Sequence, residues 1–295
     1  MDNKTNINWF PGHMAKTRRL IQENLYLVDI VIEIRDARIP QSSRNPDLGN
    51  IIGKKPRLVL LNKCDLADPD ATAKWLAFLK SIGITALAVD CKSGKGISRV
   101  VPTVRELLAD ELKKRAEKGM SGKPLRMMAV GIPNSGKSSF INRMAGSRRT
   151  KVEDRPGVTR GKQWVNLENG MALLDMPGVL MPKFEDKNIG ELLAFTGAVK
   201  DDIIDTQALA MRLVSLLSQK YPLLLSERYG FSNESSGLDE EGIINLIAKK
   251  RGMLLPGGIP DFERASIMLL DEFRGGKLGK ITLELPEISG GNRSK

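Results

Sequence analysis

Residues 131–138 read GIPNSGKS, and no other segment constrains the fold of this chain as strongly. They match the phosphate-loop pattern GxxxxGK[ST], follow an apolar run at 125–130 and open an apolar helical stretch at 137–144. Glycines in such a strand-loop-helix context let backbone N–H groups turn inward around a phosphate. The segment therefore predicts a phosphate-binding loop between a buried strand and a helix.

The rest of the first 180 residues alternates short apolar runs with helical stretches, which is typical of βαβ units around a mostly parallel sheet. The expected strands are 28–34, 57–61, 86–89, 125–130, 163–167 and 171–174, and the expected helices are 71–80, 96–114 and 137–144. From about residue 201 the pattern changes to amphipathic helices. We therefore expect the α/β class, with a mostly parallel sheet in a domain at 1–184 and a smaller helical domain at 185–295.

Individual residues of the phosphate loop have separate expected roles. Lys137 is expected to supply charge to the β- and γ-phosphates, and the Ser138 hydroxyl is expected to ligate Mg²⁺. The neighbouring residues complete the expected nucleotide-binding set, namely Asn134, Ser135, Gly136 and Ser139.

The nucleotide base is predicted from residues 62–65, which read NKCD after the apolar run at 57–61. The Asp65 carboxylate only accepts hydrogen bonds, so it suits the N1–H and exocyclic amine of guanine, whereas adenine would leave it unpaired. Lys63 is expected to lie along the purine face, and Asn62 to brace the loop. Cys91 and Lys92 occupy the place where GTPases usually have an SAK motif. The Cys91 N–H is a candidate contact for guanine O6.

Two further elements complete the pattern of a GTPase. Residues 175–178 read DMPG after the run at 171–174, so Asp175 is expected to hold Mg²⁺ and the Gly178 N–H to sense the γ-phosphate. Thr159 is the candidate switch threonine that closes over Mg²⁺, and it joins Lys137 in the expected catalytic set.

The order of these motifs is unusual. The NKCD and SAK-like segments precede the phosphate loop, whereas an ordinary small GTPase places them after DxxG. We therefore interpret the domain as circularly permuted, since neighbouring termini allow such a rearrangement.

The positive charge of the chain is concentrated in its first part. Residues 1–184 carry 32 Lys and Arg against 18 Asp and Glu, and residues 185–295 carry 14 against 17. Seven basic residues lie at 142–162, around Thr159: Arg143, Arg148, Arg149, Lys151, Arg155, Arg160 and Lys162. This pattern predicts salt-sensitive binding to an RNA backbone, with no DNA partner expected. A solvated surface without a partner is the alternative.

The remaining composition excludes several classes. Two cysteines, Cys64 and Cys91, cannot form a disulfide framework and lack metal-site spacing. No apolar run approaches the length of a membrane span, and no targeting segment is apparent. A cytoplasmic protein without a membrane partner is expected.

Together the permuted order and the segments 9–16 (WFPGHMAK), 36–38 (DAR), 62–65, 131–138, 156–159 (PGVT) and 175–178 resemble the YlqF/RbgA family of ribosome-biogenesis GTPases. The resemblance implies a bacterial GTP hydrolase, stimulated by ribosomal particles, that converts GTP to GDP. It would bind the large ribosomal subunit precursor and its rRNA, promote late 50S assembly and leave on GTP hydrolysis.

The catalytic group is the point at which the sequence departs from Ras-like enzymes. Val179 stands where such enzymes carry a glutamine that orients water, and the family resemblance suggests that His13 supplies this contact. A helix cap or an RNA phosphate contact is the alternative role for His13. Asn134 is a candidate for binding K⁺ beside the phosphates, and bracing the loop is its alternative role.

Two other functions fit the same residues. One is a GTPase whose client is a different RNA or protein, and the other is a GTP-gated RNA-binding module in which hydrolysis is incidental.

Overall fold

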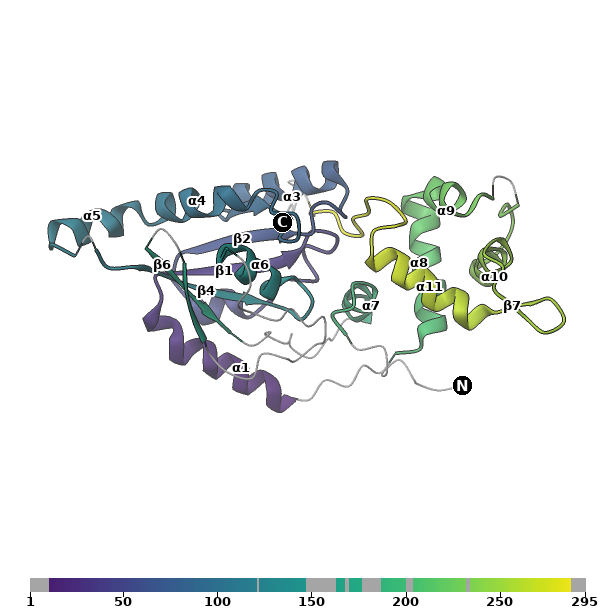
Figure 1. Ribbon diagram of the computed structural model, residues 1–295, viewed down its shortest axis with the longest axis horizontal. Helices are drawn as coiled ribbons and strands as arrows, with labels where there is room; N and C mark the ends of the chain where they lie inside the picture. Colours follow the sequence, from purple (N-terminus) through teal and green to yellow (C-terminus); the bar gives the residue numbers. More distant parts are fainter. Residues whose placement is uncertain are drawn as a thin grey trace, which may run out of the picture. The chain divides into compact units, whose positions relative to one another are not determined.

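The computed structural model of the protein describes residues 11–120, 122–146, 163–167, 170–176, 187–199, 204–231 and 234–287 (Figure 1). These residues form two compact units. One unit holds the described residues within 11–176 together with 284–287, and the other holds those within 187–283.

The first unit is built on a six-stranded sheet with the order β3-β2-β1-β4-β6-β5. Five strands run parallel, and β5 pairs antiparallel with β6. The strands are β1 (Ile30–Asp36), β2 (Arg57–Asn62), β3 (Thr85–Ala88), β4 (Leu125–Gly131), β5 (Gln163–Leu167) and β6 (Met171–Asp175). The chain adds β2 and β3 on one side of β1 and then returns to add β4 on the other side. The strand order therefore reverses between β1 and β4.

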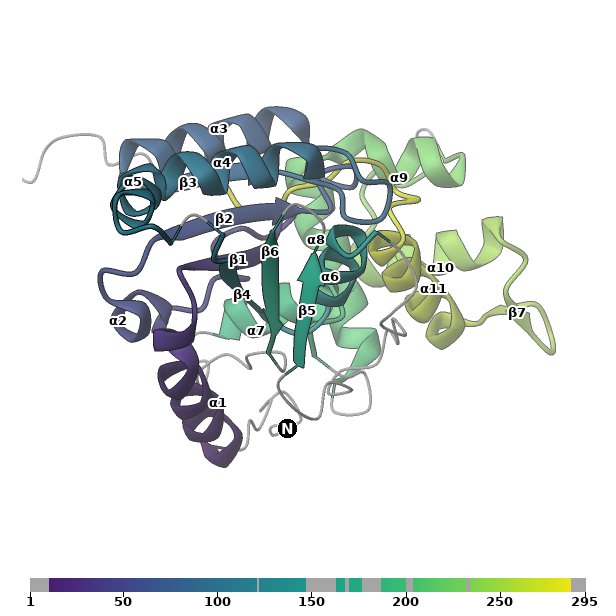
Figure 2. The same ribbon diagram turned by 60° about the vertical axis from the view of Figure 1, so that its left-hand side comes forward.

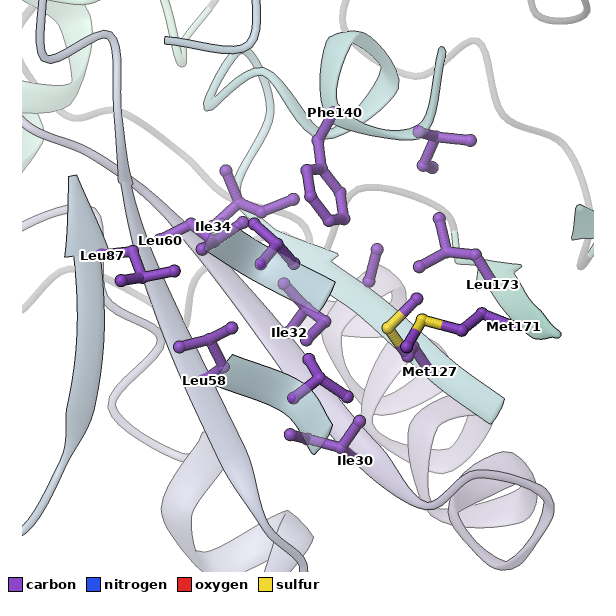
Figure 3. Packing of buried hydrophobic residues seen from close by; sticks show 14 of the residues in the cluster. Ile30, Ile32, Ile34, Leu58, Leu60, Leu87, Met127, Phe140, Met171 and Leu173 are labelled. Atoms are coloured by element: carbon purple, nitrogen blue, oxygen red, sulfur yellow. The ribbon is translucent and has the colours of Figure 1, made fainter. Parts of the chain in front are cut away.

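The two faces of the sheet are covered by different helices. Alternate residues of β1, Ile30, Ile32 and Ile34, pack with Leu58, Leu60 and Phe140 in one apolar cluster (Figure 3). The cluster also includes buried residues of α4 (Val100–Leu107). The opposite face packs against α1 (Pro11–Asn24), α2 (Leu48–Ile52) and α3 (Pro69–Ser81). Figure 2 shows α1 below the sheet and α4 above it. The central strands are therefore buried on both faces, as parallel strands require.

The remaining elements of the first unit are short helices and turns between the strands. Helix α3 begins at Pro69, and the Asp68 side chain caps it by accepting hydrogen bonds from two backbone N–H groups. Short turns η1 (Leu25–Leu27) and η2 (Ile97–Arg99) precede β1 and α4, and α5 (Ala109–Glu117) follows α4. Helix α6 (Lys137–Met144) begins directly after the phosphate loop.

The second unit is mainly helical and consists of α7 (Lys187–Phe195), α8 (Thr206–Lys220), α9 (Pro222–Tyr229), α10 (Glu240–Lys250) and α11 (Phe262–Arg274). A short hairpin joins α10 to α11, and each of its strands, β7 (Leu254–Leu255) and β8 (Ile259–Pro260), has two residues. Three of its helices begin at aspartates whose carboxylates accept backbone N–H bonds, namely Asp205, Asp239 and Asp261. Buried apolar residues of α8, α10 and α11 form its core.

The fold class predicted from the sequence is confirmed, and the six expected strands are present with ends shifted by up to two residues. The single helix expected at 96–114 is wrong, because the chain forms η2, α4 and α5 with a break at Leu108. Among the described residues no helix is both long and apolar enough to cross a membrane.

Candidate nucleotide-binding site

The sheet brings the sequence motifs to one edge. Asp36 ends β1, Asn62 ends β2 and Asp175 ends β6, while residues 90–92 follow β3 and residues 132–136 join β4 to α6. These five strands are parallel, so their carboxyl ends meet at the same edge. The strand order reverses between β1 and β4, at the centre of this edge, and open α/β sheets bind ligands at such a point.

Two glycines allow the phosphate loop to fold tightly. Gly136 has a φ of +94°, and a Cβ at this position would lie 2.1 Å from Asn62 Nδ2. At Gly131 a Cβ would lie 2.6 Å from Ser135 Oγ and 2.8 Å from the Ile34 carbonyl oxygen. Both positions therefore exclude any larger residue. Asn134 adopts a φ of +57°, a left-handed conformation that asparagine tolerates better than most residues.

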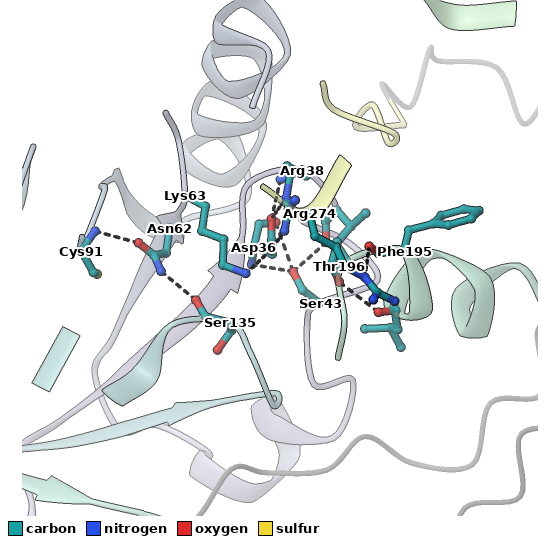
Figure 4. A network of polar contacts seen from close by, with 12 residues as sticks. Asp36, Arg38, Ser43, Asn62, Lys63, Cys91, Ser135, Phe195, Thr196 and Arg274 are labelled. Atoms are coloured by element: carbon teal, nitrogen blue, oxygen red, sulfur yellow. Dashed lines mark hydrogen bonds and ion pairs between the residues drawn. The ribbon is translucent and has the colours of Figure 1, made fainter. Parts of the chain in front are cut away.

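Asn62 holds three loops in register. Its Nδ2 donates to the Ser135 carbonyl at 2.8 Å, and its Oδ1 accepts from the Cys91 N–H at 3.0 Å (Figure 4). The side chain is buried, so neither bond competes with bulk water. Asn62 therefore connects the guanine-type loop, which the sequence expects it to brace, to the phosphate loop and to the SAK-like loop.

Lys63 is held by a carboxylate that the motif analysis did not place in the site. Its Nζ lies 3.0 Å from Asp36 Oδ2, and its backbone has a φ of +60°. Asp36 is buried and also pairs with Arg38, whose Nη2 lies 2.8 Å from Oδ2 and whose Nε lies 3.0 Å from Oδ1 (Figure 4). Burial acts to raise the pKa of Asp36, but the charges of Arg38 and Lys63 outweigh it and lower that pKa well below its usual value.

Asp65, two residues after Lys63, is exposed, so its carboxylate is accessible to a base. The Cys91 N–H, the candidate contact for guanine O6, already donates to Asn62. A contact of this group with guanine would require the N–H to be shared or released, and it stays a prediction. Burial raises the pKa of the Cys91 thiol to about 12, so the side chain is a neutral packing group.

The loop that carries Cys91 and Lys92 is ordered by Asp90 and Arg143. Asp90 accepts from the backbone N–H groups of Lys92 at 2.8 Å and Ser93 at 3.1 Å. Burial raises the pKa of Asp90, but hydrogen bonds from Ser93 and Lys92 lower it more. Arg143 of α6 donates to the carbonyl oxygens of Cys91 and Lys92. Arg143 therefore supports this loop, although the sequence groups it with the RNA-binding residues.

The phosphate side of the site holds a buried ion pair. Lys137 Nζ donates to Asp175 Oδ1, and both side chains are buried. Ser135 Oγ is buried and has no hydrogen-bond partner in the described part of the chain, so it can serve an incoming oxygen ligand.

These residues fit a magnesium nucleotide. Among the described residues no group of three or more His, Cys, Asp or Glu side chains gathers as a metal cage. Mg²⁺ commonly uses one or two protein oxygens together with phosphates and water, and Ser138 and Asp175 supply such oxygens. Thr159, Gly178 and Val179 lie outside the described residues, as does the basic segment beyond residue 146. His13 falls within α1, but its side chain is outside what the structure describes.

The phosphate loop, the NKCD loop and Asp175 meet at one edge of a permuted parallel sheet, and this combination defines a GTPase, an enzyme that binds and hydrolyses GTP. A family model described as "50S ribosome-binding GTPase" matches residues 126–220. The chain is 46% identical to Ribosome biogenesis GTPase A of Priestia megaterium over 282 residues, which cover 95% of this chain and 97% of that protein. It therefore belongs to the Ribosome biogenesis GTPase A (YlqF/RbgA) family.

Solved structures agree with this assignment. The GDP-bound structure of TM YlqF superposes with a TM-score of 0.68 at 28% identity, covering 91% of this chain and all of that one. The GNP-bound YlqF from T. maritima gives a TM-score of 0.64 at 28% identity, with 92% and 99% coverage.

Proposed function

We propose that this GTPase binds the precursor of the large ribosomal subunit, promotes late 50S assembly and leaves on GTP hydrolysis. One observation carries the proposal: Asn62 joins a guanine-type loop to a phosphate loop in a chain that aligns over nearly its whole length with a Ribosome biogenesis GTPase A. The matching family model, described as a 50S ribosome-binding GTPase, supports the choice of particle.

Each of the loops described above would bind a different part of the nucleotide. Asp65 would accept the N1–H and amine of guanine, and Lys63 would cover the purine face. Lys137 and the loop N–H groups would hold the phosphates, with Ser135, Gly136 and Ser139 completing the cradle. Ser138, Asp175 and Thr159 would hold Mg²⁺, and Gly178 would sense the γ-phosphate. When bound, Mg²⁺ would neutralise charge on the phosphate oxygens.

Guanine recognition is tested by Asp65→Asn. An amide at this position offers an N–H to the C2 carbonyl of xanthine and loses the acceptor that the guanine amine needs. We expect GDP affinity to fall by more than tenfold while affinity for xanthosine diphosphate rises. Unchanged GDP affinity would remove Asp65 from the base site.

The ribosomal partner is tested by sedimentation of tagged protein through a gradient with large-subunit precursors, in GDP and in a non-hydrolysable GTP analogue. Co-sedimentation is expected with the analogue and is expected to fall with GDP. The Asp65→Asn variant is the matched control, because it should follow the xanthine analogue instead. Association that ignores the nucleotide in both proteins would contradict the proposed cycle.

Hydrolysis would use His13 to orient water, since Val179 offers no hydrogen-bonding side chain. We expect His13→Ala to lose particle-stimulated turnover while it still binds the particle. Lys16→Ala is the control, because loss of an RNA contact would weaken binding first. Full stimulated turnover in His13→Ala would end this assignment.

Asn134 would help to bind K⁺ beside the phosphates. It lies within the phosphate loop, where its backbone is left-handed. Turnover should then be faster in KCl than in NaCl at equal ionic strength, and Asn134→Ala should remove that difference. Equal rates in the two salts for the unmodified protein would exclude this role.

The basic residues between 148 and 162 would contact the rRNA backbone. Their charge predicts an affinity that falls steeply as salt rises. An affinity for the particle that stays constant between low and high salt would contradict this contact.

A further inference from the structure

The end of strand β1 lies directly beside the guanine-type loop. In the β1–β2 register Asp36 stands opposite Asn62, so the residue after Asn62 emerges next to the Asp36 carboxylate. This carboxylate is 2% exposed, and it belongs to none of the motifs that bind nucleotide in the proposed function.

Asp36 pairs with two cations, Arg38 and Lys63, which share its Oδ2 atom. Arg38 contacts both oxygens, and its backbone N–H donates to Oδ1 at 3.0 Å. Lys63 Nζ lies 3.0 Å from Oδ2, and the Lys63 side chain keeps 23% of its surface exposed. Ser43 fixes the backbone of Asp36, because its Oγ accepts the Asp36 N–H at 3.0 Å and donates to the Ile39 carbonyl at 2.6 Å. Lys63 is therefore the only one of the two cations with an accessible surface.

A free lysine side chain samples many rotamers, and ordering it on a ligand costs conformational entropy. Asp36 removes much of that freedom by holding the ammonium group. Lys63 also has a left-handed backbone, so its Cα–Cβ direction is set by the loop. The end and the start of this side chain are thus both fixed before any ligand arrives.

We propose that Asp36 is a positioning residue for nucleotide binding: it anchors the Lys63 ammonium so that the methylene stem is preorganised to cover the purine face. Arg38 keeps Asp36 ionised and oriented, and it does not touch the nucleotide. This inference rests on the proposed function, because it assumes that Lys63 faces the base.

The experiment is a double-mutant cycle with equilibrium affinities for GDP and for inosine diphosphate, which lacks the 2-amine read by Asp65. Lys63→Met should weaken GDP binding several-fold, because methionine keeps an apolar stem but cannot be anchored by Asp36. Asp36→Asn should weaken GDP binding several-fold in the unmodified background and less than twofold in the Lys63→Met background. The ratio of GDP to inosine diphosphate affinity should stay constant in Asp36→Asn, because the Asp65 edge is untouched.

An equal loss from Asp36→Asn in both backgrounds would overturn the inference, since Asp36 would then act through the general fold of the loop. A lowered affinity ratio would overturn it for the same reason. If both Lys63→Met and Asp65→Asn leave GDP affinity unchanged, the proposed base site itself has failed, which is a different result.

Removal of the Asp36 charge alone leaves the buried Arg38 guanidinium uncompensated and can prevent folding. The double variant Asp36→Asn with Arg38→Gln removes both charges, so it keeps the cycle interpretable. The same several-fold loss, dependent on Lys63, is expected there, and its absence counts against the proposal.

Discussion

Replacement of Asn62 by alanine tests the brace that joins the loops of the site. The change removes two hydrogen bonds at a side chain that is 2% exposed, one of 2.8 Å to the Ser135 carbonyl and one of 3.0 Å from the Cys91 N–H. Each buried group left unpaired costs about 1–3 kcal/mol, so the loss of unfolding free energy should be about 3 kcal/mol. In a unit of this size that loss corresponds to a melting temperature lower by roughly 6–12 °C.

The assay is thermal unfolding without nucleotide, followed by circular dichroism. Asn50→Ala is the matched control, since Asn50 is an exposed asparagine on α2 and its removal should shift the melting temperature by no more than about 2 °C. The reasoning is refuted if the two variants melt at the same temperature. It is also refuted if Asn62→Ala melts lower but binds GDP as tightly as the unmodified protein, because the brace would then have no effect on the phosphate loop.

Three further predictions follow from other contacts. Gly136→Ala should reduce GDP affinity by roughly a hundredfold, because the new Cβ would lie 2.1 Å from Asn62 Nδ2. Gly146→Ala is the control: Gly146 also has a positive φ but no atom within 4 Å of the position that a Cβ would take, so this variant should bind GDP normally in the same titration. Glu284→Ala should lower unfolding free energy by about 2 kcal/mol, because its carboxylate accepts from the Gln41 and Ser42 N–H groups, and exposed Glu287→Ala should show no such loss in denaturant titrations. Hydrogen bonds from Arg228, although opposed by burial, lower the pKa of Glu272 below its usual value of 4.5. The stabilising effect of the Glu272 carboxylate is therefore present above that pH and is lost as the pH falls through the lowered pKa. The stability difference between the unmodified protein and Glu272→Gln should shrink between pH 5 and pH 3, and a constant difference would contradict this.

Particular residues show how far local pattern carries a prediction. Residues 131–138 predicted both the loop and the helix after it, because glycine positions and apolar flanks are set by neighbours in the chain. The helix expected at 96–114 failed because its apolar periodicity runs on through Leu108, where the chain turns between α4 and α5. The return of Glu284 to the first unit also escaped the sequence, since its partners Ser42 and Trp75 lie more than 200 residues away.

The sequence by itself determined which chemistry is available: a phosphate loop, a guanine-type loop and Asp175, the aspartate expected to hold Mg²⁺, in permuted order. These are local properties, because each motif needs only its own residues and a neighbouring strand. Only the tertiary structure decided how the motifs support one another. The pairing of β1 with β2 sets Asp36 beside Lys63, and the packing of β4 against β1 sets Ser135 within reach of Asn62. Such contacts depend on strand order and register, which arise from long-range burial and are not encoded by any short segment.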